Sequence, residues 1–119
     1  MKYFFILVIF ALSILAGCTT SVPTVKNVSP AEFNVLLNDN AIFVIDVHIP
    51  EQKHIPGTDA VIPYNNLKSL PEDKNTPIAV YCRSGSMSKE ASNELIKMGY
   101  TKVYDLIGGR NAYCTEFEC

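Results

Sequence analysis

The sequence predicts an α/β domain built around a mainly parallel sheet. Two short apolar runs, at 41–47 and 78–81, have the continuous hydrophobic character of strands that are buried on both faces. Segments with the spacing of amphipathic helices lie between such runs, so strand and helix alternate along the chain. The 119 residues suffice for one domain of ordinary size and argue against a second independent core.

The first helix is expected to begin at Ser29, which suits the N-cap position. Pro30 then occupies the first helical position and Glu32 completes a capping box. Apolar residues within 33–37 mark one helical face, and the Asn-Asp-Asn sequence at 38–40 ends the helix.

The next part of the chain begins with the apolar strand at 41–47. After it we expect a proline-containing loop at 49–57, a short strand at 60–62, one helical turn at 66–70 and a polar loop at 71–77.

The last third begins with the strand at 78–81. An amphipathic helix follows at 89–98, with its start near Ser86 or Ser88, and Gly99 suits the position just after its end. We expect a further strand at 103–106, a Gly-Gly turn at 108–109, and a tail at 110–119 that begins with a short helix.

Cys82 is the candidate nucleophile. It follows a buried strand directly, and a short loop containing Gly85 leads from it into a helix. A thiol at a helix N-terminus lies among backbone N–H groups, which lower thiol pKa values and hold anions. Asp46 also ends a strand, and ligands of parallel sheets bind at this edge. The alternative is an inert buried cysteine.

Composition argues against a nucleic-acid partner. The formal net charge is −2, no run of basic residues occurs, and the chain contains no Trp. Nucleic-acid binding needs clustered Lys and Arg, and single-strand binding adds an aromatic stacking platform. We also expect no metal site and no cofactor.

The N-terminal segment has the three-part pattern of a secretory signal peptide. Lys2 supplies the positive region, 3–12 is apolar, and Leu-Ala-Gly-Cys at 15–18 resembles a bacterial lipobox. That resemblance implies cleavage before Cys18 and lipid on its sulfur and amine. The apolar run is shorter than the about 20 residues that span a membrane. The alternatives are an uncleaved anchor and an ordinary secretory signal.

These features divide the chain into a lipoprotein signal peptide at 1–17, a lipidated tether at 18–24 and the folded domain at 25–119. The domain is then expected outside the cytoplasm, on the periplasmic side, where several lipid chains on Cys18 anchor it firmly to a membrane. In related Gram-negative lipoproteins, Asp after the cysteine favours the inner membrane, so Thr19 favours the outer one.

Cys114 and Cys119 lie five positions apart in the tail. In an oxidising compartment they could close a small disulfide that pins the tail. Alternatively, Cys114 could attack an oxidised or sulfur-loaded Cys82 in a thiol-redox cycle. A third interpretation is two surface thiols.

Four segments resemble, in order, motifs of the rhodanese family. They are Asp-Val-His-Ile-Pro-Glu at 46–51, His-Ile-Pro-Gly at 54–57, Val-Tyr-Cys-Arg-Ser-Gly at 80–85 and Gly-Gly-Arg-Asn-Ala-Tyr at 108–113. With the signal peptide and a single domain, the chain is most similar to the small periplasmic rhodaneses of the phage-shock type. The resemblance implies a mainly parallel sheet of about five strands flanked by helices.

The resemblance also implies an activity, the transfer of sulfane sulfur from a donor such as thiosulfate to a thiol or cyanide acceptor. Cys82 would carry that sulfur as a persulfide, and a redox or sulfur-acceptor protein could be a partner. The substrate would be held by the loop residues Arg83, Ser84, Gly85, Ser86, Met87 and Ser88. Asp46 and His48 would support the site.

Several of these residues also have simpler interpretations. Arg83 could be solvated, Asp46 a structural cap, and His48 and His54 turn residues. Met87 stands where the family usually has a second basic residue, and His48 stands where it has Arg. Both departures remove a cation, which puts the preference for thiosulfate in question.

Three other functions remain open from sequence alone. One is a catalytically silent rhodanese-like module for binding or sensing, and another is a thiol-redox protein. The third is a Cys-based phosphatase, although related phosphatases use a longer loop that closes on Arg, and here Ser88 is the sixth residue after Cys82.

Overall fold

The computed structural model describes Gly17 and residues 21–119, and Cys18 with its expected lipid lies outside the described residues. The described chain forms a five-stranded sheet in the order β1-β5-β4-β2-β3, with every neighbouring pair parallel. This confirms the predicted fold class. In chain order the elements are β1 (Lys26–Val28), α1 (Pro30–Leu37), β2 (Phe43–Asp46), β3 (Ala60–Val61), β4 (Ile78–Tyr81), α2 (Ser86–Lys97), β5 (Val103–Leu106) and α3 (Gly109–Glu116).

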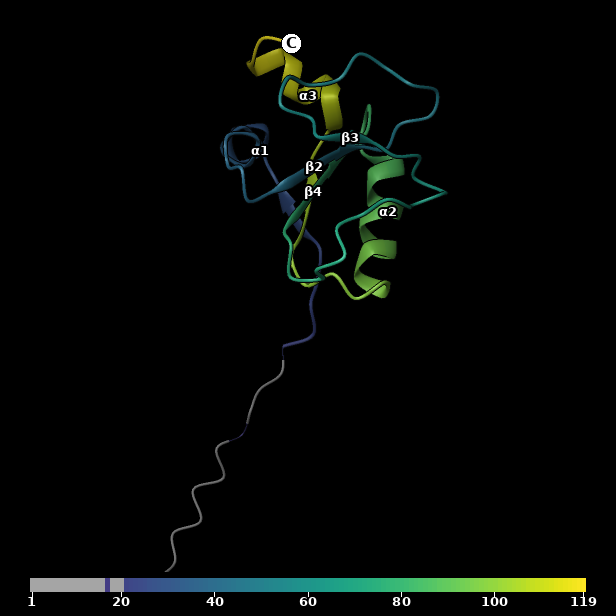
Figure 1. The fold of residues 1–119 in the computed structure, drawn as a ribbon. Coiled ribbons are helices and arrows are strands. Elements are labelled where there is room, and N and C mark those ends of the chain that lie inside the picture. Colours follow the sequence, from purple (N-terminus) through teal and green to yellow (C-terminus); the bar gives the residue numbers. More distant parts are fainter. Residues whose placement is uncertain (1–16, 18–20) are drawn as a thin grey trace, which may run out of the picture.

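Helices cover both faces of the sheet. Helix α2 packs on one face against β4 and β5, while α1 and α3 lie together on the other (Figure 1). The core is correspondingly divided, with Val80 and Leu95 in the cluster under α2, and Phe33 and Tyr113 in the cluster under α1 and α3. Cys82 belongs to the cluster under α2.

Helix α1 begins as the sequence predicts. The Ser29 side chain accepts a hydrogen bond from the Glu32 backbone N–H at 3.2 Å, and Pro30 occupies the first helical position. Such a cap is worth about 1 kcal/mol. Phe33 of this helix is completely buried. Its ring packs edge-on against the Tyr81 ring, with 5.8 Å between the two centroids.

The predicted helical turn at 66–70 is wrong. A β-turn occupies the positions just before it, where the Asn66 N–H donates to the Pro63 carbonyl at 3.1 Å. Leu67 and Leu70 instead reach the core from an irregular segment. Pro71 favours this outcome, because a residue that precedes proline is disfavoured in the helical region.

The edge strand β1 was not among the predicted strands. It has three residues, and only Val28 is buried. Its place in the sheet depends on pairing with β5, where Lys26 lies opposite Tyr104 and Val28 opposite Leu106.

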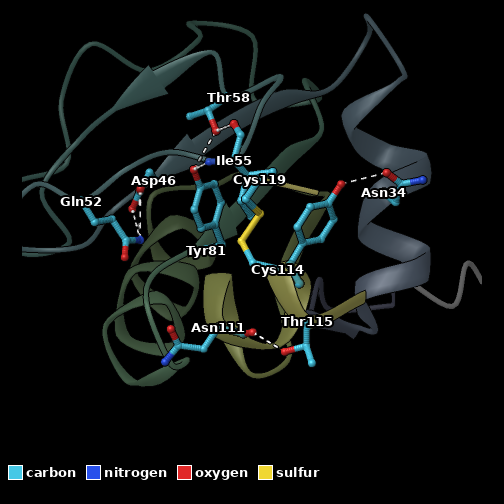
Figure 2. The surroundings of a disulfide bond; sticks show 11 residues. Asn34, Asp46, Gln52, Ile55, Thr58, Tyr81, Asn111, Cys114, Thr115 and Cys119 are labelled. Atoms are coloured by element: carbon cyan, nitrogen blue, oxygen red, sulfur yellow. Dashed lines mark hydrogen bonds between the residues drawn. A yellow bond between two sulfur atoms is a disulfide. The ribbon is translucent and has the colours of Figure 1, made fainter. Parts of the chain in front are cut away.

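A disulfide ties the residues that follow α3 back to the last part of that helix. It joins Cys114 and Cys119, whose Cα atoms are 5.6 Å apart (Figure 2). Both cysteines pack against the core cluster that contains Tyr81, and Phe117 between them stacks on Tyr113 at 4.9 Å between ring centroids. The tail is thus fixed on the face of the sheet opposite α2. In the part of the chain that the structure describes, no helix has the length and apolar character needed to cross a membrane.

Candidate active site

Cys82 lies at the carboxyl edge of the sheet, one residue past β4. It is the one free cysteine among the described residues, and it is only 1 % exposed. Its sulfur accepts a hydrogen bond from the Gly85 backbone N–H at 3.1 Å, and its thiol donates to the Ser88 hydroxyl at 3.5 Å. The loop therefore places one backbone amide and one side-chain hydroxyl on the sulfur.

The conformation of Gly85 brings that amide to the sulfur. Its φ is 115°, in the region that side-chain-bearing residues rarely adopt, and it forms the N-cap of α2. Its carbonyl accepts hydrogen bonds from the Lys89 N–H at 3.1 Å and from the Ser88 hydroxyl at 3.2 Å. The first turn of α2 is thus attached directly to the loop that carries Cys82.

The N-terminus of α3 supports the same loop from the other side. The Arg110 N–H donates to the Cys82 carbonyl at 2.9 Å, and the Asn111 N–H donates to the Arg83 carbonyl at 3.0 Å. A Cβ atom on Gly109 would lie only 2.6 Å from the Arg83 carbonyl carbon. The glycine that sequence indicated only as part of a turn is therefore required for close packing against the active-site loop.

Asp46 organises a second loop at this edge. It is 1 % exposed and accepts hydrogen bonds from the His48 N–H at 3.0 Å and from the Gln52 side chain at 3.2 Å. Its other close partner is His54, whose Nδ1 lies 2.8 Å from Oδ2. No ion pair of the described residues involves Arg83. Asp46 thus caps and braces the loop at 48–54.

The sequence alone indicates a turn residue at His54 and gives no signal at Gln52. The His54 imidazole in fact bridges Asp46 and Glu51, with Nε2 3.0 Å from the Glu51 carboxylate. These two hydrogen bonds, that to Asp46 foremost, raise the pKa of His54 above its ordinary value. His48 instead places Nδ1 2.6 Å from the Pro50 carbonyl, so its side chain is used within its own turn.

Met87 joins the two loops. It lies in the first turn of α2, packs against the core, and its sulfur accepts a hydrogen bond from the Ile49 N–H at 3.5 Å. Ile49 itself is 39 % exposed. The position where a second cation is usual therefore carries an uncharged side chain that joins α2 to the loop at 48–54.

The remaining loop residues lie on the outside. Arg83, Ser84 and Ser86 are exposed, whereas Ser88 is completely buried beside the sulfur. Arg83 is the basic side chain of the loop at 82–88, and its exposure leaves it accessible to an anion.

Asp105 is a buried acidic residue that sequence reasoning did not select. It lies in β5 with 6 % exposure, and burial raises its pKa to about 6 against the opposing effects of Ser88 and Lys89. No local pattern singles it out, because 103–106 has the pattern of an ordinary strand. Within the described residues, no three side chains of His, Cys, Asp or Glu come together in a group that could hold a metal ion.

The fold and the site define a class of protein: a parallel α/β domain with a buried thiol at the sheet edge, held between two helix N-termini. Residues 29–116 match the model of the rhodanese-like domain, and the chain belongs to this family.

Relatives in this family include sulfurtransferases of similar size. The chain is 29 % identical to a thiosulfate sulfurtransferase GlpE of Pseudoalteromonas translucida over 92 residues, which cover 74 % of this chain and 88 % of that protein. It is 39 % identical to thiosulfate sulfurtransferase PspE of Escherichia coli over 66 residues, which cover 50 % of this chain and 62 % of the relative.

The same domain also occurs inside larger proteins of other activity. A tRNA uridine(34) hydroxylase of Chlamydia caviae is 30 % identical over 110 residues, which cover 82 % of this chain but 33 % of the hydroxylase. Among solved structures, a rhodanese homologue from Thermus thermophilus superimposes with a TM-score of 0.61 at 27 % identity, covering 73 % of this chain and 99 % of that one.

Proposed function

We propose that this protein is a sulfurtransferase that passes a sulfane sulfur from a small donor to a thiophilic acceptor through a persulfide on Cys82. The observation that carries the proposal is the free Cys82 thiol at the sheet edge, with the Gly85 amide 3.1 Å from its sulfur. Membership of the rhodanese-like family and its thiosulfate sulfurtransferase relatives support the same activity.

The reaction has two displacements at sulfur. The Cys82 thiolate attacks the outer sulfur of thiosulfate, a new S–S bond forms, and the old S–S bond breaks with its electron pair leaving on sulfite. An acceptor thiolate or cyanide then attacks the outer sulfur of the persulfide, and the Cys82 thiolate is restored. Each step needs the anionic form of the attacking group and consumes no redox equivalent.

The loop supplies the electrostatic part of this chemistry. A negative charge on the Cys82 sulfur faces the Gly85 N–H and the N-terminus of α2, where the helix dipole favours anions. Among the described residues, no hydrogen bond joins either histidine to the sulfur. The His48 Nδ1 atom lies against the Pro50 carbonyl, and the His54 ring pairs with Asp46 and Glu51.

The charges of the side chains around Cys82 indicate which sulfur donor the site prefers. Arg83 is exposed and available to an anionic donor, but Met87 and His48 contribute no second fixed cation. We therefore infer weak binding of the dianion thiosulfate and better use of a donor of lower charge, such as an organic persulfide. The 1 % exposure of Cys82 favours a donor whose sulfur ends a narrow chain.

We also propose an extracytoplasmic, membrane-anchored location, on the strength of the signal-peptide pattern and Cys18. The chain as synthesised in its bacterial host would then lose 1–17 and gain lipid on Cys18. Intact mass of the protein extracted from membranes tests this. An unmodified Cys18, or a full-length chain in the soluble fraction, would contradict it.

Intact mass also tests the sulfurtransferase proposal. After incubation with thiosulfate or an organic persulfide, the wild-type protein should gain one sulfur atom, and treatment with cyanide should remove it. Cys82→Ser should gain none. A Cys114→Ser, Cys119→Ser double variant serves as the matched control and should still take up sulfur. Equal turnover by Cys82→Ser and wild type would refute the proposal.

A catalytically silent binding module is the second candidate, because Cys82 is almost completely buried. In that case the folded wild-type protein should gain no sulfur from thiosulfate or from an organic persulfide. The phosphatase alternative receives no support from the site, since Ser88 lies buried against the Cys82 sulfur and no Arg follows Arg83 in the loop.

A further inference from the structure

A buried carboxylate lies beneath the active-site loop without a complete set of partners. Asp105 is 6 % exposed, and its Oδ1 atom has no hydrogen-bond partner among the described residues. Buried carboxylates are costly unless they are paired, so an unpaired one in a small domain calls for a functional explanation.

Asp105 faces the same side of the sheet as Cys82. Its register partner in β4 is Val80, two residues before Cys82. Val80, Cys82 and Val103 all belong to the core cluster under α2, and side chains two apart along a strand share a face. Asp105, two residues after Val103, therefore lies under α2 near the sulfur.

Ser88 connects the two groups. It is completely buried in the first turn of α2, and its hydroxyl oxygen lies 3.5 Å from the Cys82 sulfur. The same hydroxyl donates to the Gly85 carbonyl at 3.2 Å, and it lies close enough to Asp105 to lower the pKa of that carboxyl against the larger effect of burial. Once it turns from the Gly85 carbonyl toward Asp105, the Ser88 hydroxyl can accept a proton from Cys82 and donate its own to the carboxylate.

We propose that Asp105 is a positioning residue that accepts the Cys82 thiol proton through Ser88; this rests on the proposed role of Cys82 as nucleophile. The Ser88 hydroxyl turns from the Gly85 carbonyl toward Asp105. The S–H bond of Cys82 then breaks as the Ser88 oxygen takes the proton, and the Ser88 O–H proton passes to the Asp105 carboxylate. The sulfur keeps the electron pair. The products are a thiolate, an unchanged serine and a neutral carboxylic acid.

This transfer moves one negative charge without changing the total. Before it, the charge is on a buried carboxylate with an unpartnered oxygen. Afterwards the charge is on the Cys82 sulfur, which faces the Gly85 N–H and the N-terminus of α2. The structure therefore provides better stabilisation for the anion after the transfer than before it.

Few other charges act on Asp105. Lys89 of α2 favours the carboxylate form by its positive charge. The strand β1 on the other side places the neutral Asn27 opposite Asp105. The remaining polar side chain on this face of α2 is the buried and uncharged Ser92.

The test is the pH profile of Cys82 alkylation by iodoacetamide, read at the Cys82 peptide by mass spectrometry. Because Cys82 and Asp105 share one proton, the wild-type profile should rise in two steps, the first near the Asp105 value of about 6. Asp105→Asn should lose the first step and react several-fold more slowly between the two steps. Ser88→Ala should show the same loss.

Ser92→Ala is the matched control. Ser92 lies one turn after Ser88 on the same face of α2, is equally buried, and its hydroxyl has no hydrogen-bond partner among the described residues. Its removal should leave both steps of the profile in place.

The opposite result is well defined. If Asp105 were only a buried negative charge, Asp105→Asn would favour the thiolate and accelerate alkylation at neutral pH. Faster alkylation of Asp105→Asn would overturn the proposal. A single-step profile in the wild-type protein would also overturn it, and that result does not depend on whether the variants fold. Alkylation needs no sulfur donor, so a two-step profile without sulfur uptake would refute the sulfurtransferase proposal and leave this one standing.

Discussion

The Cys82 sulfur has two hydrogen-bonding neighbours of different character. The Gly85 amide donates to it at 3.1 Å and stabilises a negative charge, whereas the Ser88 hydroxyl at 3.5 Å can accept the thiol proton. Donor and acceptor thus flank one atom, which suits a group that must ionise before it attacks. Met87 in the same loop is uncharged, and its sulfur accepts a hydrogen bond from the Ile49 backbone.

Replacement of Met87 by arginine should therefore increase activity with thiosulfate. A guanidinium at this position would add a second cation near Arg83 and favour a dianionic donor. We expect KM for thiosulfate to fall severalfold, measured by sulfite release. Met87→Leu, which keeps the apolar volume without charge, should leave this KM unchanged. An equal gain in both variants would show that loosened packing, and not charge, is responsible.

At the scale of elements, the loop at 82–88 is held between two helices. Helix α2 binds it through the Gly85 carbonyl, and α3 binds it through backbone N–H groups that reach the Cys82 and Arg83 carbonyls. Backbone groups supply these bonds, so the shape of the loop depends on close approach of the elements more than on side-chain identity.

Gly109→Ala should disrupt this approach. Its φ is 60°, and an added Cβ would lie 2.6 to 2.8 Å from backbone atoms of Arg83 and Cys82. We expect a loss of roughly 3 kcal/mol in the free energy of unfolding, measured by urea denaturation, together with reduced sulfur transfer.

Gly99→Ala is the matched control for this loss. Gly99 also has positive φ, at 102°, but the nearest atom to an added Cβ is a flexible Lys74 side-chain carbon at 4.0 Å. We expect only the conformational cost of about 1 kcal/mol and full activity. Equal losses for the two variants would show that backbone strain alone accounts for the effect.

The loop at 48–54 should make stability depend on pH through His54. Its pKa is raised above the ordinary 6.5 by Asp46 and Glu51, so the folded protein binds this proton more tightly than the unfolded chain. The stabilisation is complete below pH 6.5 and is lost as the pH rises through the raised value. The free energy of unfolding, followed by urea denaturation, should fall across that range.

His54→Gln should flatten this part of the profile. His48→Gln is the matched control, because the His48 ring pairs with the Pro50 carbonyl and with no carboxylate. It should retain the wild-type slope. A slope that survives in His54→Gln would mean that another group carries the pH dependence.

For the whole molecule, local patterns were sufficient where an element is defined by its own residues. The apolar runs at 43–46, 78–81 and 103–106 are strands, and the capping sequence at Ser29 begins a helix. The strand β1 could not be recognised in this way, because two of its three residues are exposed and its pairing partner β5 lies far along the chain.

The site shows the same division. Cys82, its loop and the following helix are contiguous, so sequence could place them together. Gly109 and Asp105 reach the loop only through packing of α3 and β5, and neither has a local pattern that distinguishes it from a turn or strand residue. The bridge from His54 to Asp46 likewise depends on how the loop at 48–54 folds back on itself.

The disulfide concerns the whole molecule because it fixes the end of the chain on the core. It closes a loop of few residues, for which chain entropy predicts a stabilisation of about 2 kcal/mol. The Cys114→Ser, Cys119→Ser double variant should lose about this free energy of unfolding, measured by urea denaturation. It should keep wild-type sulfur uptake at Cys82, because the disulfide packs on the face of the sheet opposite α2, whereas Cys82 belongs to the core cluster under α2. If instead uptake is kept but release to a thiol acceptor is lost while the fold remains stable, Cys114 takes part in the chemistry, and the tail belongs to a thiol-redox cycle.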